Sequence, residues 1–401
     1  MTETLSKLPP IWLIVLLAGL STLSETIYIP SLPDIAVDLR TSESMVEHTL
    51  TIYLIGFTFG ILFWGNLSDK IGRKPCVIYG LSIYIMGCIG CYFSSDIQTL
   101  MLCRFVQSFG GSIGSVLGQS ITRDAFLGSE LAKVYATVST ALAIFPAIGP
   151  IIGGNIAQNF AWNNIFLFLI IFAVIFIILV VIKLPETNKF RRDSRASSLL
   201  KVALRISKDF KVIGLGFIVA ICNGLVFSYC AEGPFYLMKT LGLSSSEYGL
   251  SFVAIAASIM LGGFISKKLH KKAYSSKAIM TYGINIILLF SIIFSIFILA
   301  HSYVVKLPLN FLIGVTISSQ MMINLGICMT SSNALTLALQ DYRDITGRAS
   351  SIFGCFYYFF TSLFTFIMGA LHNGSLITMP IYFLVLACFM LIFNKIMCSE
   401  I

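Results

Sequence analysis

Charged side chains are scarce in this sequence. Lys, Arg, Asp and Glu make up 11% of the 401 residues, while 57% are hydrophobic, whereas about a quarter of an average soluble domain is charged. So few polar side chains cannot cover a globule of this size with a wetted surface. The composition therefore excludes a soluble enzyme, a nucleic-acid-binding module and a disordered chain, and it favours a polytopic helical membrane protein.

Alternating strands and metal-ligand clusters are also missing. The apolar runs are long and continuous, unlike the strands of about 10 residues that build an outer-membrane barrel. Most of the ten cysteines lie inside these runs, as small apolar packing residues do. The histidines are scattered and predict no ligand cluster, so no metal site is expected. The four histidines are His48, His270, His301 and His372.

Twelve apolar runs are long enough to cross a bilayer, which takes about 20 residues. They predict an all-α polytopic membrane protein with twelve transmembrane helices. Their approximate limits are 11–31, 46–66, 75–94, 97–120, 134–156, 164–183, 211–231, 246–265, 277–300, 307–335, 349–371 and 377–397. The first run continues into Glu25 and Pro30 without a small-residue cleavage site, so we interpret it as a spanning helix and not as a signal peptide.

Lys and Arg are distributed unevenly between the two sides of these spans. Alternate loops and the two termini hold 23 of the 27, the opposite loops hold Arg40, Lys239 and Lys306, and Arg104 lies within a span. The positive-inside rule then places both termini in the cytoplasm. The same pattern explains the net charge of +9 without a nucleic-acid partner. We expect a monomer that crosses the lipid bilayer of a bacterial inner membrane many times.

The longest polar segment divides the chain into two sets of six spans. We expect residues 1–185 to form the first six-helix half, residues 186–210 a cytoplasmic linker, and residues 211–401 the second half. An offset of 197 residues aligns the basic loop after the second span with the one after the eighth. This weak repeat fits two pseudo-repeats around a central pathway.

The loop after the second span carries the most specific motif. Residues 65–74 read G-N-L-S-D-K-I-G-R-K, where glycines permit a tight reversal, Asp69 can pair with a cation or cap a helix, and Arg73 can bind a carboxylate in a fork. The alternative is an ordinary basic turn. The pattern resembles the signature of the major facilitator superfamily. That resemblance implies that Gly65, Asp69, Gly72 and Arg73 form a conformational latch between the halves and do not contact substrate.

Two ionisable residues lie deep inside predicted spans. Arg104 is about 10 Å from the helix end at 1.5 Å per residue, and Glu25 lies about 20 Å from the opposite side of the core. Their similar depths predict a buried ion pair. A carboxylate whose protonation depends on that contact can load and release H⁺. The alternatives are a static pair that fixes helix packing, or an Arg104 that snorkels from its helix end.

The fourth span strengthens the resemblance. Arg104 belongs to an Arg-x-x-Gln-x-x-Gly pattern, and in the superfamily this arginine is implicated in proton coupling.

The fifth span contains five conformationally special residues. Its glycines form a small-x-x-x-small face that allows close helix packing, and its prolines kink the helix. A plain packing motif is the alternative. In the superfamily, Gly-Pro-x-x-Gly-Gly at this place is associated with antiporters, so the resemblance implies export. The residues are Pro146, Gly149, Pro150, Gly153 and Gly154.

Three further segments, at 49–57, 122–124 and 184–187, resemble the bicyclomycin-resistance branch of the twelve-span drug:H⁺ antiporters. The resemblance implies a secondary active transporter and not an enzyme. It would be a proton-coupled antiporter that exports drug-like or amphipathic small molecules across the inner membrane. The proton gradient would drive it, and no cofactor is implied.

Aromatic and amide side chains within the spans define a candidate substrate pocket, because aromatic walls with few polar groups suit bulky amphipathic ligands. The candidates are Tyr28, Tyr53, Phe57, Gln119, Asn223, Phe227, Tyr229, Asn324, Tyr357 and Tyr358. Glu232 precedes Pro234 near the outer end of the seventh span, and we interpret it as a residue of the pathway mouth and not as a coupling site.

Three other functions remain open at this point. An uptake carrier for a nutrient or a polycarboxylate siderophore would keep the fold and use Arg104 to bind a substrate carboxylate. A membrane-embedded transferase would need a nucleophile, an acid–base cluster or a metal site, and the sequence indicates none. A sensor that has lost transport would usually carry a soluble output domain, and the loops are too short for one.

Overall fold

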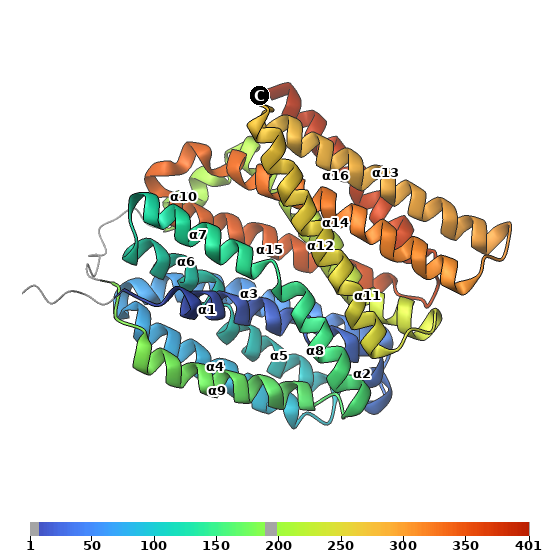
Figure 1. Ribbon diagram of the computed structural model, residues 1–401, viewed down its shortest axis with the longest axis horizontal. Coiled ribbons are helices and arrows are strands. Elements are labelled where there is room, and N and C mark those ends of the chain that lie inside the picture. Colours follow the sequence, from blue (N-terminus) through green and yellow to red (C-terminus); the bar gives the residue numbers. More distant parts are fainter. Residues whose placement is uncertain (1–7, 189–198, 401) are drawn as a thin grey trace, which may run out of the picture.

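The structure, a computed structural model, describes residues 8–188 and 199–400, and every regular element within those ranges is a helix (Figure 1). Twelve helical segments there are long and apolar enough to cross a membrane. This confirms the predicted all-α class and the number of spans. Four basic residues of the predicted linker, at positions 189, 191, 192 and 195, lie outside the described residues, as does Lys7.

The first six spans are formed by α1 (Ile11–Thr26), η1 (Ile29–Ser31), α2 (Leu32–Asp38), α3 (Glu43–Ile71), α4 (Arg73–Tyr92), α5 (Ile97–Gly111), α6 (Ile113–Ala125), α7 (Gly128–Leu142), α8 (Phe145–Asn159) and α9 (Asn164–Lys183). The last six follow the short helix α10 (Leu199–Ile206) and are formed by α11 (Phe210–Pro234), η2 (Phe235–Thr240), α12 (Ser245–Lys271), α13 (Ser276–Tyr303), α14 (Leu309–Leu339), η3 (Gln340–Ile345), α15 (Thr346–Leu371) and α16 (Thr378–Glu400).

Side-chain caps fix where several of these helices begin. Ser42 Oγ accepts the backbone N–H of Met45 in the first turn of α3 at 3.3 Å, and Asp96 Oδ1 accepts that of Thr99 in the first turn of α5 at 2.9 Å. Asp209 caps α11 at 3.2 Å, and Ser244 and Glu247 form a reciprocal capping box at the start of α12. Each cap satisfies a backbone donor that has no partner inside its own helix.

Proline sets the shape of three spans. The first span breaks after α1 and continues through η1, with Pro30, into α2, so it extends to Asp38 and not to the predicted residue 31. The fifth span breaks between α7 and α8 just before Pro146. The seventh continues past Pro234 into the wide turn η2 and reaches Thr240. These breaks follow from the amide hydrogen that proline lacks and from its clash with the preceding turn.

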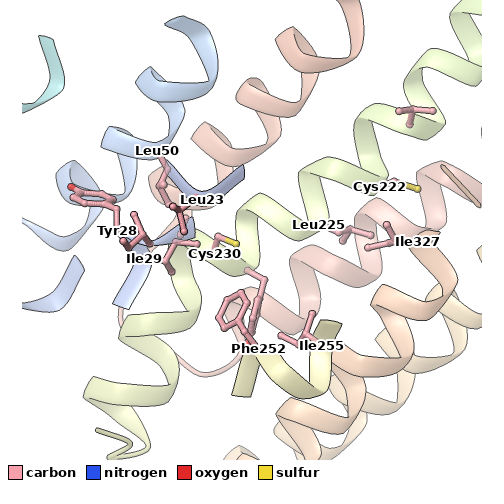
Figure 2. Packing of buried hydrophobic residues seen from close by; sticks show 14 of the residues in the cluster. Leu23, Tyr28, Ile29, Leu50, Cys222, Leu225, Cys230, Phe252, Ile255 and Ile327 are labelled. Atoms are coloured by element: carbon pink, nitrogen blue, oxygen red, sulfur yellow. The ribbon is translucent and has the colours of Figure 1, made fainter. Parts of the chain in front are cut away.

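The helices pack into two bundles, which we call the first half (residues 8–188) and the second half (residues 199–400) (Figure 1). The halves meet where α3 runs along α15 and α8 runs along α12. Figure 2 shows Cys230 of α11 beside Leu23 and Ile29 of the first span. The exact limits predicted for the halves, at residues 185 and 211, stay a prediction.

The two ends of the bundle differ in how the halves meet. We call the end where α3 turns into α4 the Gly72 end, and the opposite end, where α15 leads to α16, the His372 end. Contacts between the halves gather at the His372 end. Ser44 Oγ donates to the Gly369 carbonyl oxygen at 2.6 Å, and the rings of His48 and Phe366 stack with centroids 4.6 Å apart.

Candidate functional site

Arg104 lies on α5 and is fully buried. Its Nη1 donates to Gln107 Oε1 at 2.6 Å, and Gln107 Nε2 donates to Cys88 Sγ at 3.1 Å. The guanidinium carbon lies 4.3 Å from the ring centroid of Tyr28 and 4.2 Å from that of Tyr53. Two aromatic faces and an amide oxygen therefore compensate the buried charge. Arg104 does not snorkel to its helix end.

The expected ion pair between Glu25 and Arg104 is not formed. Within residues 8–188 no hydrogen bond or ion pair joins the two side chains, because the tyrosine rings and Gln107 occupy the surroundings of the guanidinium. Glu25 is nevertheless buried and lies within Coulombic range of Arg104. It also lies within that range of Cys230, Tyr357 and Tyr358 of the second half. The carboxylate thus faces the boundary between the halves.

Several predicted pocket residues gather around this pair. The rings of Tyr53 and Phe57 stack with centroids 6.4 Å apart, and Phe57 contacts Tyr358 of the second half at 5.0 Å. The ring centroids of Tyr357 and Tyr358 are 4.8 Å apart. The Tyr28 hydroxyl forms a hydrogen bond of 3.0 Å with the hydroxyl of a threonine of α3. An aromatic group from both halves therefore surrounds one buried carboxylate and one buried guanidinium, which we call the central site.

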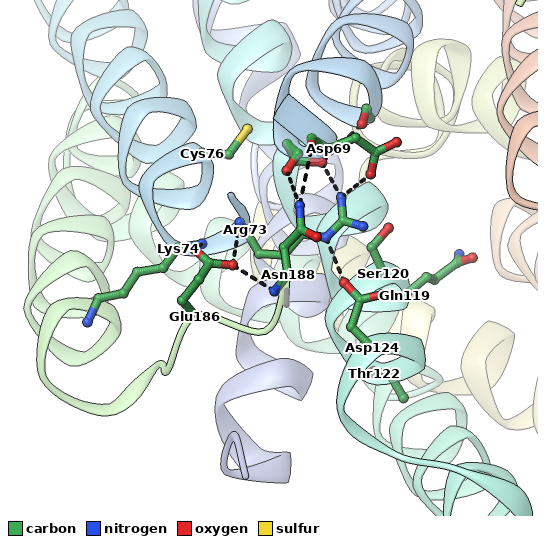
Figure 3. A network of polar contacts seen from close by, with 12 residues as sticks. Asp69, Arg73, Lys74, Cys76, Gln119, Ser120, Thr122, Asp124, Glu186 and Asn188 are labelled. Atoms are coloured by element: carbon green, nitrogen blue, oxygen red, sulfur yellow. Dashed lines mark hydrogen bonds and ion pairs between the residues drawn. The ribbon is translucent and has the colours of Figure 1, made fainter. Parts of the chain in front are cut away.

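The remaining pocket candidates have their known contacts elsewhere. The amides of Asn223 and Asn324 donate to carbonyl oxygens one turn earlier in their own helices. Tyr229 packs against a phenylalanine of α12, and Phe227 is buried on α11. Gln119 is exposed on α6, and Figure 3 places it beside the polar network of the Gly72 end. Their part in a pocket stays a prediction.

The predicted latch residues form a network at the Gly72 end (Figure 3). Arg73 Nη1 contacts Asp69 Oδ1 and Ser68 Oγ, both at 2.7 Å, and Arg73 Nε contacts Asp124 Oδ2 at 2.8 Å. All three partners belong to the first half. Gly65 lies at a different contact, where α3 faces α15. The network orders the loop between α3 and α4, and its role as a latch between the halves stays a prediction.

Glu186 completes this network from the segment that leaves α9. Its carboxylate accepts the backbone N–H of Arg73 at 2.9 Å and that of Lys74 at 3.1 Å, which caps α4. Asn188 donates to the Asp69 carbonyl oxygen at 3.1 Å. Gly72 adopts φ 107° at this junction, and a Cβ there would press against the Glu186 carboxylate. Only glycine adopts that backbone conformation readily.

The special residues of the fifth span place α8 against two neighbours. Pro146 lies in the first turn of α8 and Pro150 within it. A Cβ at Gly149 or Gly153 would overlap atoms at the end of α1, and a Cβ at Gly154 would overlap the backbone at the start of α12. The close-packing interpretation is therefore confirmed by the geometry, while the association with antiport stays a prediction.

A second polar site joins the halves at the His372 end. His372 Nε2 lies 2.9 Å from Glu43 Oε2, and His372 Nδ1 lies 2.8 Å from Glu232 Oε2 and 3.0 Å from Glu47 Oε1. Lys239 forms an ion pair with Glu43. Glu43 and Glu47 come from α3, whereas the other three come from the second half. We call these five residues the His372 cluster.

This cluster corrects the expectation that all four histidines stand apart from other ligand-type side chains. The atoms of Glu47, Glu232 and His372 that could bind a metal ion lie within 4.8 Å of one another, a spacing that one ion could bridge. Burial lowers the pKa of His372, but the adjacent carboxylates of Glu232 and Glu47 outweigh burial and raise it to about 10. With that pKa the ring carries two protons at neutral pH, and a metal ion would have to displace one of them.

Two residues of the cluster were missed in the sequence. Glu43 and Glu47 stand one helical turn apart at the start of the second span. A second carboxylate one turn inside an apolar helix is a signal of function that could have been used. Glu232 was placed near the mouth of the pathway, and it lies in this cluster at the His372 end.

Comparisons with known proteins agree with this architecture. The family model of the Major Facilitator Superfamily matches residues 14–365. An "Uncharacterized transporter" of Rickettsia bellii is 34% identical over 385 residues, which cover 94% of each chain. A "Bicyclomycin resistance protein homolog" of Haemophilus influenzae is 24% identical over 357 residues, 84% of this chain and 83% of that one. A crystal structure of a D-xylose–proton symporter shares the fold, with TM-score 0.74, 15% identity and coverage of 95% and 97%.

Proposed function

Since the chain belongs to the major facilitator superfamily and is a multi-pass membrane transporter and not an enzyme, we propose that it is a proton-coupled antiporter. It exports drug-like or amphipathic small molecules across the bacterial inner membrane, as a monomer driven by the proton gradient. Relatives named for bicyclomycin and multidrug resistance support this class of substrate. Glu25 binds the transported proton.

The observation that carries the proposal is the position of Glu25. It is a buried carboxylate of the first half that lies within Coulombic range of Cys230, Tyr357 and Tyr358 of the second half. A transporter that alternates its access moves the halves against each other around a midplane site. A carboxylate at that boundary meets a different environment in each state, and it therefore binds a proton in one state and releases it in the other.

Arg104 fixes the charge of the same site. Its guanidinium supplies a positive charge, and protonation of Glu25 changes the charge of the central site by one. A cationic or amphipathic substrate stacks on Tyr53, Phe57 and Tyr358 and is displaced when Glu25 is neutralised. The membrane potential adds about 2.3 kcal/mol per charge and 100 mV.

The distribution of basic residues orients the cycle. The loops at the Gly72 end hold most Lys and Arg, while the opposite loops hold Arg40, Lys239 and Lys306. By the positive-inside rule the Gly72 end faces the cytoplasm, together with both termini, and the His372 end faces the periplasm. Protons then enter from the His372 end and leave at the Gly72 end.

Proteoliposomes with an interior pH dye test the coupling. With an acidic interior, lipophilic cations, phenicol-like neutral compounds or citrate-type chelators are added in turn to wild type, Glu25→Gln and Glu130→Gln. The expected result is outward proton movement triggered by a lipophilic cation or a neutral drug. Glu25→Gln loses this movement, and Glu130→Gln keeps it because Glu130 is exposed at the start of α7. Substrate-triggered proton flux that survives in Glu25→Gln rules out this assignment of the proton site.

A second function is favoured by one specific observation at the central site. Nε and Nη2 of the buried Arg104 have no hydrogen-bond partner among the described residues. Two free guanidinium donors suit the carboxylate of a substrate. In that case the chain is an uptake carrier for a nutrient or a polycarboxylate siderophore, and protons move in the same direction as the chelator. Chelator accumulation in intact cells that Arg104→Ala abolishes would select this function over export.

A further inference from the structure

The His372 cluster is a group of five ionisable side chains that the central site does not use. It joins the halves at one end of the molecule, with Glu43 and Glu47 from α3 and Glu232, Lys239 and His372 from the second half. Any motion that parts the halves at this end must separate these side chains.

The hydrogen bonds of the cluster leave one carboxylate without a donor. The imidazolium of His372 has two N–H groups, and these are used by Glu43 at 2.9 Å and Glu232 at 2.8 Å. Glu47 Oε1 lies 3.0 Å from the same Nδ1, but neither oxygen of Glu47 has a hydrogen-bond partner in the part of the chain that the structure describes. The Glu47 side chain is 0% exposed, and a buried carboxylate without a donor is costly.

The charges leave the same side chain uncompensated. Three carboxylates face two cations, and the Lys239 side chain is 63% exposed and pairs with Glu43 at the rim. The other ionisable groups nearby do not help Glu47. His48 stacks on a phenylalanine of α15, and the hydroxyl of Tyr236 on η2 has no hydrogen-bond partner among the described residues. One negative charge is therefore left over in the buried interior between Glu47 and Glu232.

We propose that Glu47 and Glu232 together bind one proton when the His372 end is closed, and that this proton holds the two halves together there. A proton between the two carboxylates supplies the missing donor and removes the surplus charge. When the halves part, Glu47 leaves with α3, both carboxylates meet water, and the proton dissociates. Closure of this end is thus linked to proton uptake at a site separate from Glu25.

The surroundings provide a path for that proton. A cavity of about 290 Å³ is lined by four residues of the cluster, namely Glu43, Glu232, His372 and the exposed Lys239. It connects the cluster with the rim of the His372 end. This proposal concerns the conformational equilibrium alone, so it stands whether or not Glu25 couples transport to protons.

The test measures closure directly, without substrate. Genetically encoded spin-label side chains at Val37 and Tyr303, exposed positions of the first and second half, report the distance between the halves for the full chain in nanodiscs. In wild type the closed fraction is expected to fall as the pH is raised from 5 to 9. Glu47→Gln, which is permanently neutral, stays closed, with a closed-to-open ratio at pH 9 at least tenfold above that of wild type.

Asp96→Asn is the matched control. It also converts a carboxyl to an amide in the first half, and an asparagine still caps α5, so its pH profile follows wild type. If Glu47→Gln does not fold, Glu232→Gln serves in its place, since it removes the other half of the pair and is likewise expected to abolish the pH dependence.

Three results overturn the proposal. The first is a wild-type closed fraction that does not change with pH. The second is a pH midpoint that Glu47→Gln and Glu232→Gln leave in place. The third is closure that depends on added Zn²⁺ and not on pH, which would assign the cluster to a metal ion.

Discussion

Two arginines show how the surroundings of a guanidinium decide what it can do. Among the described residues Arg104 has no carboxylate contact, and it is held by Gln107 and two tyrosine rings, which leaves its charge available to the central site. The guanidinium of Arg73 binds Asp69, Asp124 and a serine. Arg104 can therefore interact with a ligand or with a carboxylate that changes its protonation nearby, whereas Arg73 orders the connection between α3 and α4.

The fork of Arg73 predicts the effect of a substitution that keeps the charge. Arg73→Lys loses the planar geometry that reaches Asp69 and Asp124 at once, so we expect a loss of about 1–2 kcal/mol in stability and slower transport. Lys70→Arg is the control, because Lys70 is an exposed residue of the last turn of α3. Thermal unfolding in detergent and transport in proteoliposomes measure both effects. Equal unfolding temperatures for Arg73→Lys and wild type would show that the network does not hold the loop.

At the scale of elements, α8 packs closely against a helix of each half. Gly149 and Gly153 let it approach the end of α1, while Gly154 lets it approach α12 of the other half. A helix that touches both halves through backbone atoms has no side chains there that can adjust. Motion of the halves must therefore carry α8 with α1 or separate it from α12.

A pair of glycines tests this constraint. Gly153→Ala places a methyl group on the backbone of α1, so we expect destabilisation of about 1–3 kcal/mol and loss of most transport. Gly314→Ala on α14 meets nothing within 4 Å, so it is expected to be neutral or to gain up to about 1 kcal/mol. Thermal unfolding of the two purified variants gives the comparison. Similar behaviour of both would mean that α1 and α8 do not need this close approach.

At the scale of the molecule, the two ends are held in different ways. Charged groups from both halves meet at the His372 end, whereas the contacts of Arg73 at the Gly72 end lie within the first half. In this state the halves are therefore joined electrostatically at the His372 end. Protonation at the His372 end therefore changes the contact between the halves, whereas the Gly72 network stabilises the first half alone.

This difference predicts how stability depends on pH. Burial lowers the pKa of His372, but the carboxylates of Glu232 and Glu47 raise it to about 10. The pKa of an unfolded histidine is about 6.5. A raised pKa contributes stability that is complete below about pH 6.5 and is lost as the pH rises through about 10. Wild type should therefore lose thermal stability over this window by an amount that His372→Gln does not show.

His301→Gln is the control for that series. His301 lies at the same end and accepts a backbone N–H at 3.0 Å, so its replacement should leave the pH dependence of wild type. Parallel melting curves for wild type and His372→Gln between pH 6.5 and 10 would contradict the raised pKa.

The sequence by itself determined the membrane class, the twelve spans and the special residues of the loop and the fifth span. These follow from composition, apolar run length and residues whose backbone preferences act locally. The tertiary structure alone decided which charges meet. Arg104 contacts Gln107 and two tyrosine rings and not Glu25. Glu43 contacts His372, which is 329 residues away in the sequence. Apolar periodicity shows that a helix is buried, but the rotation and register that bring one buried carboxylate to one imidazole depend on packing among all the helices.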